Sequence, residues 1–137
     1  MFSNEREEMR QVYFKAWDKY LQQIPLEPLE TQLVEIILLH PEYHPVLAQA
    51  EDYQHADFEQ GNPFLHLGLH MALREQVNTN RPLGIQQVYQ ALCIKLGDKH
   101  NAEHQMIDVL ADVLWQAQQS GKMPDEESYL VKLKQLG

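Results

Sequence analysis

Six of the seven histidines of this 137-residue chain fall into three pairs of the form His-x-x-x-His. The pairs are His40 with His44, His66 with His70, and His100 with His104. Random placement of seven histidines would give about 0.3 such pairs. Residues four apart lie on one side of a helix, so the two imidazoles of a pair can bind the same ion. Neutral imidazole is the commonest side-chain metal ligand, and the spacing therefore indicates a metal site.

A carboxylate lies inside the third pair. The order His100-x-x-Glu103-His104 matches the signature of inverted zinc proteases, in which two histidines bind zinc and the glutamate is the general base. Proteases of that class are much longer than this chain, so we do not assign it to them. We predict instead that Glu103 is a metal ligand or, in a catalytic site, the acceptor of a proton from metal-bound water.

The candidate ligands form a nitrogen and oxygen set without a thiolate. One ion would need three or four of these groups, and two ions could use all of them. Such a set suits zinc, iron, manganese or nickel, and we expect a divalent transition metal, with zinc or iron favoured. The predicted ligands are His40, His44, His66, His70, His100, His104 and Glu103, and Glu103 is also the candidate catalytic residue.

The apolar periodicity is helical almost throughout the chain, and no alternating run predicts a strand. We expect an all-α, single-domain helical bundle of five or six helices over residues 1–137. The helices are expected at 5–22, 28–40, 62–77, 85–96 and 99–120, with a short sixth from 124. Asp98 is a good N-terminal cap, and Gly97 and Gly121 suit helix ends. The histidines of the first pair each precede a proline, which disfavours helical geometry at both.

The helical spacing directs the candidate ligands toward apolar faces. Segment 62–73 is apolar nearly all round, and His66 and His70 are its strongly polar side chains after the cap. In the fifth expected helix, Glu103 and its flanking histidines lie beside the apolar face. That face consists of Ile107, Leu110, Ala111 and Leu114. His40 continues the apolar face of the second helix. That face consists of Leu29, Leu33 and Ile36.

Other interpretations of the histidines stay open. They could be core or interface residues bound to backbone carbonyls and to carboxylates such as Glu35, Glu42 or Glu75. The protein would then be a non-catalytic helical interaction protein, and clustered histidines could also sense pH. If the protein is an enzyme, which the sequence leaves undecided, it would be a metal-dependent hydrolase or redox enzyme. Arg74, one turn after His70, could pair with a carboxylate or hold an anionic substrate.

Composition excludes several classes of protein. The net charge is −9, and nucleic-acid affinity depends on lysine and arginine, so we expect no nucleic-acid partner. No apolar run approaches the roughly twenty residues of a membrane helix. The single cysteine cannot form a disulfide framework, and the first residues do not resemble a targeting signal. We therefore expect a cytoplasmic protein with a small-molecule or protein partner, able to form oligomers. Cys93, Trp17 and Trp115 fit core positions.

Four segments resemble a particular family. They are HPEYH (40–44), NPFLHLGLH (62–70), HNAEH (100–104) and LWQAQQSG (114–121). The chain resembles short bacterial proteins classed as a domain of unknown function and found mainly in proteobacteria. This resemblance implies one domain in the bacterial cytoplasm and no established activity. The paired histidines also look like those of hemerythrin and DinB-like metal bundles, but the hemerythrin elements His-x-x-x-x-Asp and His-x-x-x-Glu are missing.

Overall fold

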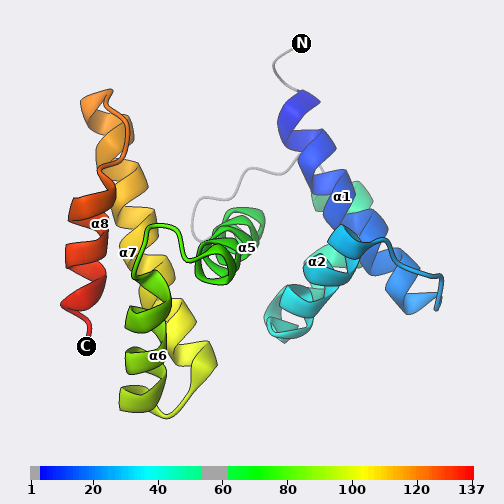
Figure 1. Ribbon diagram of the computed structural model, residues 1–137. Coiled ribbons are helices and arrows are strands. Elements are labelled where there is room, and N and C mark those ends of the chain that lie inside the picture. Colours follow the sequence, from blue (N-terminus) through cyan, green and yellow to red (C-terminus); the bar gives the residue numbers. More distant parts are fainter. Residues whose placement is uncertain (1–3, 54–61) are drawn as a thin grey trace. The chain divides into compact units, whose positions relative to one another are not determined.

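The computed structural model describes residues 4–53 and 62–137, which form eight α-helices and one short 3-10 turn (Figure 1). The predicted all-α class is confirmed, and the described residues contain no strand. The predicted number of five or six helices is wrong, because two single-turn helices also form. These are α3 (His44–Leu47) and α4 (Ala50–Tyr53). Among the helices of the described ranges, none combines the length and the apolar character needed to cross a bilayer.

The chain divides into two compact units, Met1–Gly68 and Leu69–Gly137. Helix α5 (Pro63–Thr79) begins in the first unit and continues in the second. Its start is the predicted one, since the Asn62 side chain accepts the backbone N–H of Phe64 at 2.9 Å. That residues 1–137 form a single domain stays a prediction.

The first unit is built on α1 (Asn4–Leu21) and α2 (Pro28–Leu38), which pack against each other. Glu30 joins them, because its carboxylate accepts a hydrogen bond from Lys19 Nζ of α1 at 2.9 Å. The same oxygen accepts the backbone N–H of Glu27 and so closes the first turn of α2. Buried apolar side chains of the two helices form the core. They are Tyr13, Phe14, Ala16, Trp17, Leu33, Val34, Ile36 and Ile37.

The chain turns sharply after α2, through the 3-10 segment η1 (Pro41–Tyr43). His40 has the predicted non-helical geometry, with φ −126° and ψ 69°. His44 does not, since its φ of −59° and ψ of −40° are helical. Pro45 lies in the first turn of α3, where a missing N–H costs nothing, so the helix starts in spite of it. Residues 54–61 lie outside the described residues.

The second unit contains the rest of α5 with α6 (Ile85–Leu96), α7 (Lys99–Ser120) and α8 (Glu126–Lys134). Helices α6 and α7 begin and end at the predicted residues. Asp98 caps α7 by accepting the backbone N–H of His100 at 3.1 Å. Gly97 and Gly121 end α6 and α7 with φ values of 69° and 70°, in the left-handed region that glycine adopts without strain. The unit has its own core, which includes Leu73, Ile85, Leu92, Ala102, Met106, Ile107, Leu110 and Leu133.

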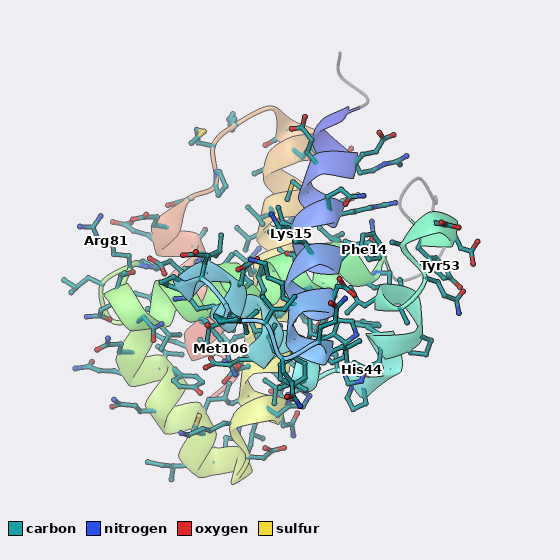
Figure 2. The ribbon with its side chains drawn as sticks, turned by 90° about the vertical axis from the view of Figure 1, so that its right-hand side faces the viewer. Phe14, Lys15, His44, Tyr53, Arg81 and Met106 are labelled. Carbon is teal, nitrogen blue, oxygen red and sulfur yellow. The ribbon has the colours of Figure 1, made fainter. Side chains whose placement is uncertain are left out.

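Three predicted core positions are wrong. Leu29 is 55% exposed, Leu114 is 40% exposed and Trp115 is 59% exposed. In α7 the buried face includes Met106 (labelled in Figure 2) and Val113, so it is rotated away from Leu114. The apolar residues of these helices outnumber the positions on one face, and packing between helices decides which of them are buried.

The cap of α7 gives a stability prediction. Replacing Asp98 by alanine removes the acceptor for the His100 N–H, and we expect the free energy of unfolding to fall by about 1 kcal/mol. Urea denaturation followed by circular dichroism measures this change. The control is Asp108→Ala, which removes an exposed aspartate from the middle of the same helix and should not destabilise the protein. Equal loss in both variants would contradict the capping role.

Candidate metal centre

Two imidazoles face each other in the first unit. His40, just after α2, has no solvent exposure, and its Nδ1 lies 2.8 Å from the carbonyl oxygen of Ile36. A carbonyl oxygen only accepts hydrogen bonds, so Nδ1 carries the hydrogen and a neutral His40 ring has its lone pair on Nε2. This Nε2 lies 3.1 Å from Nε2 of His66, in the first turns of α5. A neutral His40 thus directs this lone pair at a second histidine.

The separation of these two nitrogen atoms fits two kinds of interaction. A hydrogen bond between two neutral rings has this length when His66 Nε2 carries the hydrogen. Two nitrogen ligands at about 2.0–2.1 Å from one tetrahedral zinc ion would be separated by about 3.3 Å, so the pair also fits a shared ion. The position of the hydrogen on a neutral His66 ring decides between the two interactions. With the hydrogen on Nε2, His66 donates to His40, and with the hydrogen on Nδ1, both Nε2 atoms can bind one ion.

His44 (labelled in Figure 2) is held differently from His40. Its Nε2 lies 3.0 Å from the carbonyl oxygen of Ile37 and therefore carries a hydrogen. The ring packs on Trp17, with ring centroids 4.6 Å apart. The predicted pair thus uses two successive carbonyls of α2, and the structure brings His40 together with His66 instead. That His44 is a metal ligand stays a prediction.

The second unit contains a buried pair of histidine and carboxylate. His70, on α5, has no solvent exposure, and its Nε2 lies 2.5 Å from Oε1 of Glu103 on α7. One nitrogen of His104 lies within 4.8 Å of a nitrogen of His70. The rings of His100 and His104 are also close, with centroids 4.0 Å apart. The predicted third pair therefore does share one side of α7, and it lies near His70.

Three donors surround the Glu103 carboxylate. Besides His70, Arg74 Nε donates to Oε1 at 3.1 Å, and the Tyr89 hydroxyl of α6 donates to Oε2 at 2.9 Å. Burial on its own would raise the pKa of Glu103, but the hydrogen bonds from His70 and Tyr89 and the charge of Arg74 outweigh it. The pKa of Glu103 falls to about 2, so the group is ionised at neutral pH. Burial and the neighbouring Glu103 raise the pKa of Tyr89.

This arrangement favours a positioning role for Glu103. An ionised carboxylate only accepts, so His70 Nε2 carries a hydrogen and a neutral His70 ring has its lone pair on Nδ1. Histidine ligands of metals almost always donate their second nitrogen to a carboxylate or a carbonyl in this way. Both oxygens of Glu103 are already engaged by His70, Arg74 and Tyr89.

Of the two roles predicted for Arg74, pairing with a carboxylate is the one seen, since its Nε contacts Glu103, whose side chain is 8% exposed. Arg74 follows His70 by one helical turn and so lies on the same side of α5. One part of this network was missed. The sequence did not indicate the role of Tyr89, because its spacing from other residues does not show that its hydroxyl reaches Glu103 on α7.

A small all-helical protein with buried histidine clusters is the class that this fold and these geometries define. The chain belongs to the family described as a domain of unknown function (DUF1841), whose model matches residues 5–135. The predicted membership of such a family is thereby confirmed, while the proteobacterial origin stays a prediction. No curated protein and no solved structure matches the chain.

The Glu103 network gives a prediction for pH dependence. Because the folded-state pKa is below the ordinary value of 4.5, Glu103 stabilises the fold above about pH 4.5 and loses this contribution as the pH falls toward 2. Glu103→Gln should lower the free energy of unfolding by about 1–3 kcal/mol at pH 7. The difference from the unchanged protein should shrink at pH 3.

Urea denaturation in the presence of a chelator measures both values without a contribution from metal. The matched control is Asp112→Asn, the same chemical change at an exposed position of α7. A destabilisation by Glu103→Gln that is equally large at pH 7 and pH 3 would contradict the ionised state of Glu103.

Proposed function

We propose that the protein binds divalent transition-metal ions, with His40 and His66 as ligands within the first unit and, separately, His70 and His104 as ligands within the second. The observation that carries this proposal is the way in which the two fully buried histidines are held. His40 gives one nitrogen to a carbonyl and His70 gives one to a carboxylate. In a neutral ring the lone pair is then on the other nitrogen, which is the arrangement found in metal-binding histidines.

The neighbouring histidines supply further nitrogen ligands. His66 Nε2 lies 3.1 Å from Nε2 of His40, and a nitrogen of His104 lies within 4.8 Å of one of His70. Imidazole suits zinc, iron, copper and nickel, and of these we propose zinc or iron. Metal analysis of the purified protein measures the number of ions.

A metal-dependent hydrolase or redox enzyme is a narrower proposal on the same residues. A bound metal would supply a Lewis acid that lowers the pKa of a coordinated water. The contribution of the chain would be to orient the ligands, with Glu103 fixing His70 and the Ile36 carbonyl fixing His40. Catalysis also requires a coordination position that is open to a small molecule.

One set of contacts favours the second candidate, a helical interaction protein with structural histidines. His40 and His44 are each bound to a carbonyl of α2, and His70 is bound to Glu103. Protein groups thus already satisfy one polar atom of each ring, which is what purely structural buried histidines need.

Metal analysis of protein purified without a histidine tag distinguishes the two functions. We expect at least one equivalent of transition metal by mass spectrometry, and a lower melting temperature after chelation. His66→Gln and His70→Gln should each remove half or more of the metal, whereas Asp112→Asn should retain it. Less than about half an equivalent of metal, with no chelator effect on melting, favours the interaction protein.

Because His70 is buried, its replacement could unfold the second unit and release metal indirectly. His66 is only half-buried, so His66→Gln provides the cleaner test when circular dichroism shows an intact fold. Cobalt(II) substitution adds a direct measurement, since the visible absorption of cobalt changes when a nitrogen ligand is lost.

His44 tests which ligand set is correct. Its Nε2 donates to the Ile37 carbonyl, so we expect His44→Gln to retain metal and to leave the cobalt spectrum unchanged. Loss of metal as complete as in His66→Gln would instead support the ligand pair predicted from the sequence. The two variants are compared by metal content at equal helical content.

A further inference from the structure

The second unit contains a cavity of about 270 Å³ beside the Glu103 network. Its lining comes from α5, α6 and the start of α7. The apolar part of the wall is made by Leu73, Val77 and the ring of Tyr89. A second cavity of about 650 Å³ shares Val77, Asn78, Tyr89 and Lys99 with the first, so the space extends along α6. Small-molecule sites commonly have an apolar wall of this kind with a few polar groups.

Two cationic side chains, Arg74 and Lys99, also line the first cavity. Arg74 uses Nε for Glu103, and within residues 4–53 and 62–137 its two outer nitrogen atoms have no acceptor. The ammonium group of Lys99 likewise has no ion-pair or hydrogen-bond partner in the described part of the chain. The donors of both cations are therefore available to a ligand.

The charge balance of the lining favours a monoanion. Glu103 contributes one negative charge, but this charge is already compensated by the donors around it. Arg74 and Lys99 contribute two positive charges, so the lining carries one net positive charge. A guanidinium presents its donors in a planar fork that matches a carboxylate.

Lys99 is the first residue of α7 and directly follows Asp98, whose carboxylate already accepts the N–H of His100. Its contribution to a ligand is therefore its own ammonium charge at the rim of the cavity and not the end of the helix.

From these observations we propose that the cavity binds a small monocarboxylate with a short apolar body. The carboxylate contacts Arg74 and Lys99, and the apolar body packs on Leu73, Val77 and the Tyr89 ring. Asn78, also in the lining, provides an amide that can donate to a carboxylate oxygen. The proposal does not depend on metal binding, since none of the cavity residues that contact the carboxylate is a proposed metal ligand.

Titration with benzoate tests the site, because benzoate combines one carboxylate with a compact apolar ring. We expect saturable binding with a dissociation constant on the order of 1 mM, as for other ligands of this size. Benzamide, which has the same shape without the charge, should bind roughly tenfold more weakly. Amide shifts in nuclear magnetic resonance spectra should concentrate on α5, α6 and the start of α7.

Two variants locate the site. Lys99→Gln should weaken benzoate binding roughly tenfold, whereas Lys122→Gln, the same change at an exposed position after α7, should have no effect. Val77→Phe fills the cavity without changing its charge and should also weaken binding. Arg74 is not the first choice for replacement because it contacts Glu103 and could alter the fold.

The titrations are run on chelator-treated and on zinc-loaded protein. Equal affinity in the two forms is expected, and it would separate this site from the proposed metal site. Failure to saturate with benzoate, or equal affinity in the Lys99→Gln and Lys122→Gln variants, overturns the proposal. Binding that occurs only in the zinc-loaded form overturns it as well, because the carboxylate would then be a metal ligand. Stronger binding of inorganic phosphate than of benzoate would show that the site takes a dianion.

Discussion

The buried carboxylate of Glu103 is the constraint on which the second unit depends. It lies on α7, accepts hydrogen bonds from His70 and Arg74 of α5 and from Tyr89 of α6, and so connects three helices through one charge. A buried charge is tolerated only when it is paired and hydrogen-bonded. The helices are therefore held in one register, since moving any of them would leave the carboxylate unsatisfied. The same bonds orient His70 and place Arg74 in the wall of the cavity.

In the first unit, backbone carbonyls and not a carboxylate accept the hydrogen bonds of the histidine rings. The carbonyls of Ile36 and Ile37 accept the ring nitrogens of His40 and His44, so no buried charge is required. Each unit thus contains a fully buried imidazole with one nitrogen assigned to an acceptor. The acceptor is a neutral carbonyl in the first unit and a charged carboxylate in the second. A charged acceptor makes the other nitrogen of the ring a more basic metal ligand.

The sequence predicted local features better than contacts between helices. The ends of α6 and α7 were predicted because Gly97, Asp98 and Gly121 act within a few residues of themselves. The pairing of His40 with His66 was not predicted, since it depends on how the turn after α2 packs on α5. Trp115 was placed in the core by its apolar character, but the buried face of α7 turns elsewhere. Spacing alone selected the histidines as candidate ligands, and packing between helices determined their partners.

Two carbonyls at the end of α2 each accept a backbone hydrogen bond and a histidine ring hydrogen bond. Ile36 accepts the backbone N–H of Leu39 as well as the ring of His40, and Ile37 accepts the N–H of His40 as well as the ring of His44. The two imidazoles therefore add hydrogen bonds to the final turn of α2, where Pro41 prevents the helix from continuing. Fraying of this turn and release of the His40 ring would be a single event. Amide hydrogen exchange at the end of α2 would then report on the position of the His40 ring.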